Sequence, residues 1–245
     1  MLKSQIIAHR GASKYAPENT MPSFQIASEM QADGIETDVQ LTKDGIPILI
    51  HDENLRRTTG KKGFVKDYLL DDIQKLDAGR YFSKKYAGTK IITLEEFLRW
   101  ASKEKLYLNL ELKNNKIEYK DIEHIVLEAL EKHQLLERTT VSSFNPNSIK
   151  RMRQLDEKLD VALLRSKRHP NLVEYALDQG ASSLHINRRL LNNSIVDNCK
   201  KHGLPLRVYT VNRRSTIYQC LKLKCDGIIT DDPDKAFMLR KRYNR

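Results

Sequence analysis

The fold of this chain is decided by residues 34–51, which read GIETDVQLTKDGIPILIH. Two apolar, β-branched runs at 34–41 and 46–51 are separated by only four residues, Thr42 to Gly45. A crossover between parallel strands needs at least about a dozen residues, so the two runs must form an antiparallel hairpin that turns at Asp44-Gly45. The hairpin therefore contributes a single strand to any parallel sheet.

Outside the hairpin, short apolar segments alternate with longer amphipathic segments, which is typical of βα units and a parallel sheet. The other predicted strands are Gln5–His9, Leu106–Leu112, Thr139–Phe144, Val161–Leu164, Ser182–Ile186, Leu206–Val211 and Gly227–Thr230. The predicted helices are Thr20–Gln31, Leu94–Lys103, Tyr119–Gln134, Pro146–Leu155, Asn171–Gln179, Leu190–Lys201, Arg213–Lys222 and Pro233–Arg240. Eight βα units in 245 residues predict an α/β fold, a (β/α)₈ TIM barrel.

One segment interrupts this alternation. Residues 53–92 separate the hairpin from its helix, and glycines are scattered through them. We interpret residues 1–245 as a single domain that carries this segment as a small insertion. Because the insertion leaves from the strand end at His51, it should lie over the C-terminal rim, where barrel enzymes have their sites. A lid or substrate-shaping role is one hypothesis, and a purely structural subdomain is the other.

The composition is that of a soluble protein, with 40% hydrophobic and 31% charged residues. No apolar stretch approaches the roughly 20 residues of a membrane span, so we expect no stable membrane insertion. The N-terminal segment is too short to be a cleaved signal peptide with an apolar core. Cys199, Cys220 and Cys225 lack zinc-site spacing and are interpreted as buried thiols in a reducing compartment. These features predict a cytoplasmic protein.

The net charge of +11 would attract anionic partners, including nucleic acid. However, the basic residues are spread over the predicted helices and are clustered only at the C-terminal end. We therefore expect a solvated basic surface and no nucleic-acid partner.

Three carboxylates indicate a cation site. Glu36 and Asp38 are alternate strand residues and point the same way, so one would take up a proton unless a cation favoured both charges. A pair held by Arg or Lys is the alternative. Strict alternation in residues 108–113 places Glu111 and Lys113 on one face together with Asn109. Three carboxylate ligands suit Mg²⁺ or Ca²⁺ better than structural zinc.

Two histidines, His9 and His51, end the strands on either side of this carboxylate pair. Such a pair titrates near neutral pH and can divide the work of base and acid. Asp52 would either orient a ring or anchor the following loop. Arg10 would contact a phosphate or pair with Glu18, and Gly11 permits a close turn after it.

Other residues near strand ends are weaker candidates. Lys113 would hold a phosphoryl oxygen or pair with the carboxylates, and Tyr209 would form an apolar wall of the pocket or belong to the core. We interpret Glu18-Asn19-Thr20 and Thr230-Asp231-Asp232-Pro233 as architectural, with helix caps at Asn19 or Thr20 and at Asp232. Further rim candidates are Ser143, Phe144, His185 and Asn187.

Seven motifs, in this order, resemble those of the glycerophosphodiester phosphodiesterase family: His9-Arg10-Gly11, Glu18-Asn19-Thr20, Glu36-x-Asp38, His51-Asp52, Glu111-x-Lys113, Tyr209-Thr210-Val211-Asn212 and Asp226-Gly227-Ile228-Ile229-Thr230-Asp231. The resemblance implies a barrel with an insertion after the second strand. It also implies divalent-cation-dependent hydrolysis of glycerophosphodiesters, such as glycerophosphocholine or glycerophosphoethanolamine, to sn-glycerol 3-phosphate and an alcohol.

The resemblance assigns roles to matching positions. It makes Glu36, Asp38 and Glu111 the metal ligands, His9 the proton acceptor and His51 the proton donor, with the phosphate held by Arg10 and Lys113. The nucleophile would be water or the neighbouring glycerol hydroxyl. Tyr209 departs from the Trp that is more common in the family, which keeps an aromatic wall but bears on the choice of alcohol.

The main alternative is a phospholipase D-like phosphodiesterase that acts on lysophospholipids. An apolar rim would favour it, whereas residues 53–92 are largely polar. We therefore favour a small, soluble glycerophosphodiester as the substrate. A non-catalytic, phosphate-binding barrel is disfavoured because every expected ligand and both histidines are present.

Overall fold

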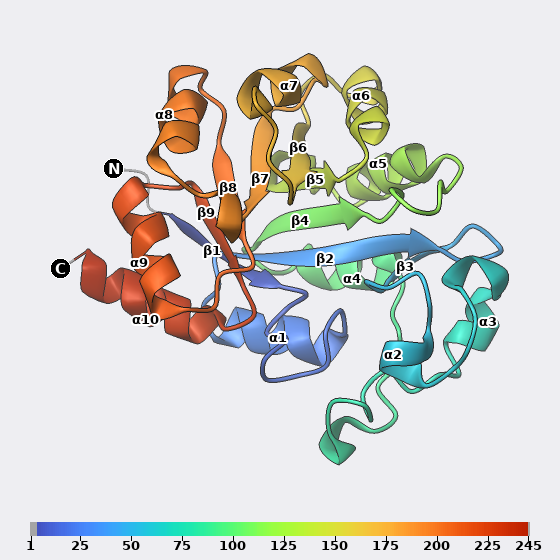
Figure 1. The fold of residues 1–245 in the computed structure, drawn as a ribbon. Helices are drawn as coiled ribbons and strands as arrows, with labels where there is room; N and C mark the ends of the chain where they lie inside the picture. Colours follow the sequence, from blue (N-terminus) through green and yellow to red (C-terminus); the bar gives the residue numbers. More distant parts are fainter. Residues whose placement is uncertain (1–3, 245) are drawn as a thin grey trace.

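The computed structural model describes residues 4–244, in which eight parallel strands close into a barrel (Figure 1). The barrel strands are β1 (Gln5–His9), β2 (Gly34–Leu41), β4 (Tyr107–Leu112), β5 (Thr139–Ser143), β6 (Asp160–Arg165), β7 (Ser183–Asn187), β8 (Leu206–Tyr209) and β9 (Gly227–Thr230). Each strand pairs with the next, and β1 closes the ring by pairing with both β2 and β9. The predicted TIM barrel is therefore confirmed.

Helices surround the barrel, as Figure 1 shows. They are α1 (Met21–Glu29), α4 (Leu94–Ala101), α5 (Ile122–Lys132), α6 (Pro146–Leu155), α7 (Leu172–Asp178), α8 (Asn193–Lys201), α9 (Arg214–Leu223) and α10 (Pro233–Tyr243). Short 3₁₀ turns, η3 (Leu136–Arg138) and η4 (Arg188–Leu190), precede β5 and α8. The boundaries differ from the predicted ones by a few residues, as expected where helix ends fray.

The hairpin predicted at residues 42–45 is present. Strand β3 (Pro47–Leu49) runs antiparallel to β2, with Leu41 opposite Pro47 and Val39 opposite Leu49. The Ile50 amide donates to the Asp38 carbonyl at 3.0 Å, so pairing continues to the residue before His51. The turn thus returns the chain alongside the strand that carries Glu36 and Asp38.

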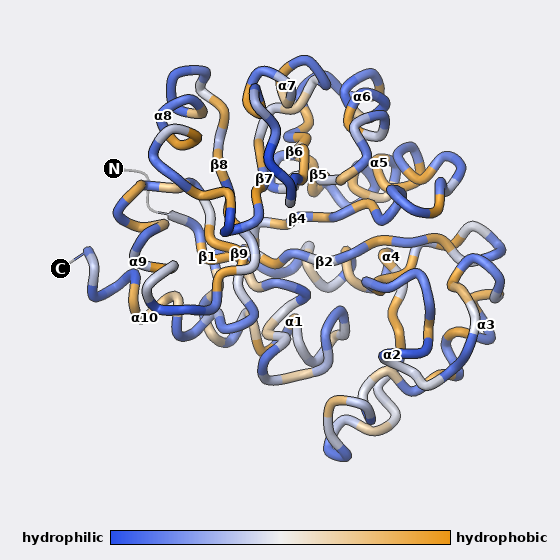
Figure 2. Tube along the Cα trace, viewed as in Figure 1, coloured by the Kyte–Doolittle hydropathy of each residue, from blue (hydrophilic) through white to orange (hydrophobic). Residues whose placement is uncertain are grey.

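The main core lies between the barrel and its helices. Leu108, Leu110 and Leu112 of β4 are at most 1% exposed and belong to this core, whereas their neighbours Asn109 and Glu111 point into the barrel. Figure 2 shows apolar segments concentrated in the strands and polar segments at the periphery. Packing against the helices therefore fixes which face of β4 is turned inward.

Residues 53–92 form the insertion, drawn at the lower right of Figure 1. It contains α2 (Arg56–Thr59), η1 (Val65–Asp67), α3 (Leu70–Ile73) and η2 (Lys84–Tyr86). A small second core joins it to the hairpin through Ile48, Ile50, Leu55, Val65, Ile73, Ala78 and Ile91. Within residues 4–244, no helix combines the length and hydropathy needed to cross a bilayer.

Candidate active site

Three buried carboxylates meet at the C-terminal end of neighbouring strands. Glu36 and Asp38 come from β2 and Glu111 from β4, and each offers an oxygen within 4.8 Å of the others. The register explains the cluster, because Asp38 lies opposite Glu111 while Glu36 lies opposite His9 of β1. The exposed fractions of these residues are 3%, 1% and 8%, so the three acids are shielded from solvent.

The charges of this cluster fit a divalent cation. Burial and the neighbouring Asp38 raise the pKa of Glu36 to about 8. Burial opposes ionisation of Asp38 as well, but Arg10 and Lys113 hold its pKa well below the usual range. The buried Asp38 Oδ1 accepts no hydrogen bond from the described residues. An oxygen that accepts no hydrogen bond, within a hard, all-oxygen set, fits the ligands that Mg²⁺ and Ca²⁺ prefer.

Two cations and an amide hold the carboxylates in place. Lys113 Nζ donates to Glu111 Oε1 at 2.8 Å and lies 3.7 Å from Asp38 Oδ1. Arg10 Nε lies 3.3 Å from Asp38 Oδ2, which also accepts from Asn19 Nδ2 at 2.9 Å. Arg10 NH1 also donates to Glu18 Oε1 at 2.9 Å, so the ion pairs considered as alternatives to phosphate contact are present for both cations.

The turn after β1 depends on a glycine. Arg10 and Gly11 have φ angles of 56° and 79°, and a Cβ on Gly11 would lie 2.4 Å from Ser23 Oγ. In this turn the Arg10 amide donates to Glu36 Oε2 at 2.9 Å. The tight turn therefore positions both the backbone and the side chain of Arg10 at the carboxylates.

His9 is held by an aspartate from the other end of the chain. Its Nδ1 lies 2.6 Å from Asp231 Oδ1, just beyond β9, and its Nε2 lies 4.0 Å from Glu36 Oε2. Ser13 Oγ also donates to Asp231 Oδ1, at 3.2 Å. Burial disfavours the imidazolium, but the charges of Glu36 and Asp231 raise the pKa of His9 above 6.5. His9 is thus oriented by a carboxylate.

His51 has the same arrangement with its neighbour in sequence. Its Nδ1 lies 2.5 Å from Asp52 Oδ1, and Arg57 Nε donates to Asp52 Oδ2 at 2.5 Å. Gln40 fixes the backbone by donating to the carbonyl of His51 at 3.0 Å. Asp52 therefore does both things considered for it, since it orients the ring and anchors the following loop through Arg57.

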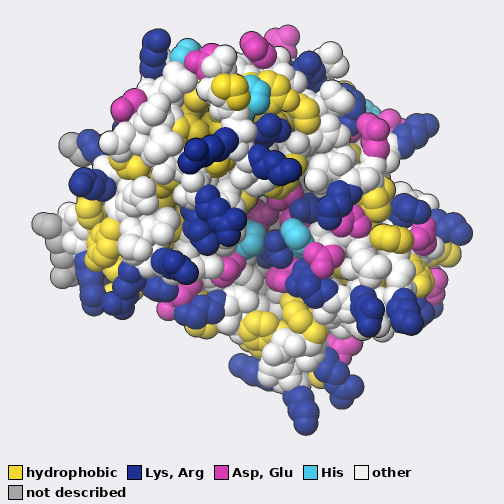
Figure 3. Space-filling model, viewed as in Figure 1, with side chains coloured by type: hydrophobic (Ala, Val, Ile, Leu, Met, Phe, Trp, Pro, Cys, Tyr) yellow, Lys and Arg dark blue, Asp and Glu magenta, His cyan; other side chains and the backbone are white. Residues whose placement is uncertain are grey.

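Figure 3 shows histidine, acidic and basic side chains together in a hollow near the centre of this face. A cavity of about 460 Å³ opens there beside His9 and Arg10. It is lined by His9, Arg10, Ser13, Lys14, Glu18, Asn212, Asp231, Asp232 and Lys235. Charged groups of both signs thus converge on one opening at the barrel mouth.

The model of the glycerophosphoryl diester phosphodiesterase family matches residues 9–235, which contain all of these groups. The chain belongs to this family. A glycerophosphodiester phosphodiesterase of Caldanaerobacter subterraneus subsp. tengcongensis is 40% identical over 241 residues, covering 98% of this chain and 99% of that protein. One from Bacillus subtilis is 37% identical, covering 97% and 86%. These relatives place the chain among the phosphoric diester hydrolases.

A solved structure shares the whole fold with this family member. It is a phosphodiesterase from Oleispira antarctica in complex with the product sn-glycerol-3-phosphate. The two chains are 29% identical and superpose with a TM-score of 0.91, over 98% of this chain and 97% of the other.

Some contacts in this phosphodiesterase were not predicted from sequence. The segment Glu18-Asn19-Thr20, interpreted as architectural, also supports the carboxylate cluster. Glu18 Oε1 accepts from Arg10 NH1 at 2.9 Å, and Asn19 Nδ2 donates to Asp38 Oδ2 at 2.9 Å. Thr20 does precede α1, and its amide donates to Ser23 Oγ. Asn19 lies between Glu18 and Thr20 in a motif shared with the family, and this position could have indicated a contact with the site.

The segment after β9 was also undervalued. Asp231 directly follows a predicted strand, so it belongs to the same edge as His9, and that signal was present. Helix α10 begins at Pro233 as predicted, but the Asp232 side chain makes no cap hydrogen bond. It accepts instead from Lys14 Nζ and Tyr15 Oη, at 2.5 and 2.8 Å.

The aromatic and weaker rim candidates divide into two groups. The rings of Tyr209 and Phe144 pack edge-on, with their centroids 6.1 Å apart. Burial and the negative charge of Glu111 raise the pKa of Tyr209. His185 does not belong to the rim. It lies inside the barrel, with Nε2 3.3 Å from Arg207 NH1.

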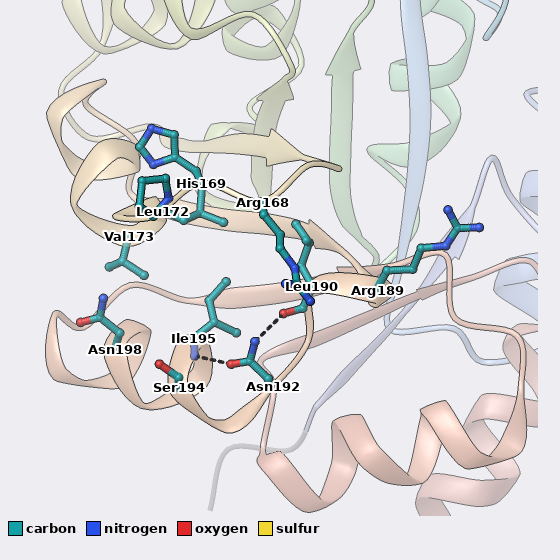
Figure 4. Close-up of a pocket in the computed structure, with 11 residues that line it drawn as sticks. Arg168, His169, Leu172, Val173, Arg189, Leu190, Asn192, Ser194, Ile195 and Asn198 are labelled. Atoms are coloured by element: carbon teal, nitrogen blue, oxygen red, sulfur yellow. Dashed lines mark hydrogen bonds between the residues drawn. The ribbon is translucent and has the colours of Figure 1, made fainter.

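A second cavity, of about 450 Å³, lies outside the barrel between α7 and α8 (Figure 4). Arg168 and Arg189 contribute to it from the loops after β6 and β7. Its polar groups are partly satisfied locally, since Asn192 bonds to the Leu190 carbonyl and the Ile195 amide. None of the predicted site residues lines this cavity.

Proposed function

We propose that this protein hydrolyses glycerophosphodiesters, such as glycerophosphocholine or glycerophosphoethanolamine, to sn-glycerol 3-phosphate and an alcohol. The observation that carries the proposal is the cluster of Glu36, Asp38 and Glu111, flanked by two histidines that each contact a carboxylate. The product bound in the Oleispira antarctica relative supports this substrate class.

The three carboxylates would hold a divalent cation, Mg²⁺ or Ca²⁺. When bound, this ion would offset negative charge on the phosphoryl oxygens. It would also neutralise the repulsion that raises the pKa of Glu36. We therefore expect activity to depend on a divalent cation, because three buried carboxylates repel one another without it.

Arg10 and Lys113 would bind the phosphate. Their charged atoms lie at the same carboxylates, within 3.3 Å and 2.8 Å of a carboxylate oxygen. From there they can donate to phosphoryl oxygens and stabilise charge that develops in the transition state. Tyr209, near Glu111, would form a wall against the alcohol or glycerol portion.

The two histidines would move the protons. His9 would take a proton from the attacking hydroxyl as its oxygen bonds to phosphorus, and Asp231 would stabilise the resulting imidazolium. His51 would give a proton to the departing alkoxide as the phosphorus–oxygen bond to the alcohol breaks. The attacking hydroxyl would belong to water or to the neighbouring glycerol carbon. In the second case a cyclic phosphate forms first, and attack by water then opens it to sn-glycerol 3-phosphate.

We also propose that the barrel acts as one catalytic domain in the cytoplasm, with residues 53–92 shaping its mouth. Cys199, Cys220 and Cys225 are free and buried, which supports a reducing compartment. Tyr81 of the insertion supports the second idea, because its Oη accepts from the Glu18 amide at 3.2 Å beside the site.

The first test is release of sn-glycerol 3-phosphate from a panel of glycerophosphodiesters. We expect chelation to abolish release and Mg²⁺ or Ca²⁺ to restore it. His9→Ala and His51→Ala should each lower turnover roughly 100-fold or more. His124→Ala is the matched control, since His124 is exposed on α5 and pairs with Glu128. Near-normal turnover in either active-site variant would refute the two-histidine mechanism.

A second readout does not depend on turnover. Because an ion that binds the folded state stabilises it, Mg²⁺ or Ca²⁺ should raise the melting temperature of the wild-type protein. Glu111→Gln removes one ligand charge and should reduce this shift. An equal shift in both proteins would place the cation elsewhere.

A further inference from the structure

The insertion contributes one side chain that contacts both halves of the site. Arg57 of α2 donates from NH1 and NH2 to Glu18 Oε2 and Oε1, each at 2.7 Å, and from Nε to Asp52 Oδ2 at 2.5 Å. All three nitrogens of the guanidinium are therefore engaged. A planar fork held in this way is geometrically defined, which a single flexible ammonium would not be.

Each carboxylate held by Arg57 in turn contacts a residue of the proposed mechanism. Asp52 Oδ1 lies 2.5 Å from His51 Nδ1, and Glu18 Oε1 accepts from Arg10 NH1 at 2.9 Å. An unbroken series of charged contacts thus runs from the proposed acid, through Arg57, to the proposed phosphate ligand.

We propose that Arg57 is a positioning residue that sets the geometry of His51 through Asp52 and of Arg10 through Glu18. This inference rests on the proposed function. It assigns the insertion a specific task, which is to hold the proton donor and the phosphate ligand in register with each other. Arg57 itself touches no reacting atom.

The two branches predict different kinetic signatures. Asp52 fixes which nitrogen of His51 carries the proton, so disturbing this branch should slow only reactions whose leaving group needs that proton. Glu18 orients the guanidinium of Arg10, so disturbing that branch should weaken binding of every phosphodiester and raise KM. Arg57 belongs to both branches and should show both effects.

The experiment compares Arg57→Gln with wild type on two diesters that share the glycerophosphoryl group. One releases an alkyl alcohol, as glycerophosphocholine does, and the other releases p-nitrophenol, which leaves without protonation. Carboxylates that orient metal-binding histidines contribute about 10- to 100-fold, and we take the same range for Asp52 and His51. We expect kcat to fall by roughly that factor for the alkyl diester and by less than about 3-fold for the aryl diester. KM should rise for both.

Two single-branch variants and a control complete the design. Asp52→Asn should reproduce the leaving-group-dependent fall in kcat with little change in KM, and Glu18→Gln should reproduce the rise in KM for both diesters. Arg56→Gln is the matched control, because Arg56 is the adjacent exposed arginine and its side chain makes no ion pair among the described residues. It should behave as wild type. Arg57→Lys keeps the positive charge but loses the planar guanidinium, so its kcat and KM should lie between those of wild type and Arg57→Gln.

The outcomes separate this inference from the proposed function. If wild type releases sn-glycerol 3-phosphate but Arg57→Gln is unchanged, or loses turnover equally on both diesters, the positioning role is wrong. Melting temperatures close to wild type for Arg57→Gln and Arg57→Lys are required for the kinetic comparison, and a collapse of both would assign Arg57 to folding instead. If wild type releases no product with any cation, the proposed function itself fails.

Discussion

At the scale of single residues, the histidines proposed to transfer protons depend on partners from distant parts of the chain. Asp231 and His9 are separated by 222 positions, yet their side chains lie 2.6 Å apart. Asn212 also donates to Asp231, so the carboxylate is held from a third direction. The orientation of the histidine is therefore a property of closing the barrel, because β1 and β9 become neighbours only then.

The contact between Asp231 and His9 predicts that a single conservative substitution will strongly lower kcat. In Asp231→Asn the amide would favour the wrong tautomer of His9 and would not stabilise its protonated form. We expect kcat for release of sn-glycerol 3-phosphate to fall roughly 100-fold or more, with KM little changed.

Asp234→Asn is the control for this variant, since Asp234 lies three residues away and accepts from Tyr15 Oη. It should keep near-normal turnover. A full-rate Asp231→Asn enzyme would mean that His9 needs no orienting carboxylate.

At this scale, the sequence alone predicted the residues of the carboxylate cluster but not all of the partners of the site residues. Alternation along β2 and β4 was sufficient for Glu36, Asp38 and Glu111, because side chains two apart share a face. Arg57 gave no such signal, and Glu18 appeared only as a possible ion-pair partner of Arg10. Their contacts, from an irregular insertion and a loop, depend on how these segments fold back over the barrel.

At the scale of elements, the first turn of α4 is fixed by a reciprocal capping box. Thr93 Oγ1 accepts from the Glu96 amide at 3.1 Å, and the Thr93 amide donates to Glu96 Oε2 at 2.7 Å. This helix directly follows the insertion, so its start determines where residues 53–92 rejoin the barrel.

The capping box predicts a measurable loss of stability. Thr93→Ala leaves the Glu96 amide without its acceptor and should lower the free energy of unfolding by about 1 kcal/mol. Urea denaturation would measure this, with an unchanged m-value indicating that both states keep their compactness. Thr93→Ser retains the hydroxyl and should lose much less. Equal losses would point to the threonine methyl instead of the cap.

At the scale of the whole molecule, the barrel interior carries a charged layer below the site. His185 is completely buried, with Nε2 3.3 Å from Arg207 NH1, and Arg207 NH1 lies 3.4 Å from Asp160 Oδ2. Burial and the charge of Arg207 lower the pKa of His185 to about 3. At a pH between these two pKa values, about 3 and 6.5, the imidazole is therefore neutral in the folded barrel but protonated in the unfolded chain.

The sign of the pH dependence follows from that difference. Below the ordinary pKa of 6.5 the unfolded state binds a proton that the folded state does not, so stability falls as the pH falls from 6.5 towards 3. The loss between pH 7 and pH 5 should be about 2 kcal/mol from this group.

His185→Gln isolates the effect, because an amide can still accept from Arg207 but does not titrate. Other groups, including the carboxylates of the site, titrate in both proteins and cancel in the comparison. Unfolding free energies measured at pH 7 and pH 5 should therefore fall less in His185→Gln than in wild type. Equal falls would show that His185 does not contribute to acid sensitivity.

The barrel, the hairpin and the residues of the carboxylate cluster are predictable from the sequence. These follow from local rules, since a four-residue connection excludes a crossover and alternation assigns each strand residue to a face. The groups that orient the histidines and Arg10 depend on the tertiary structure. The contacts of Asp231 with His9 and of Arg57 with Glu18 join segments far apart in the chain, and their geometry is fixed only when the barrel closes and the insertion packs against its rim.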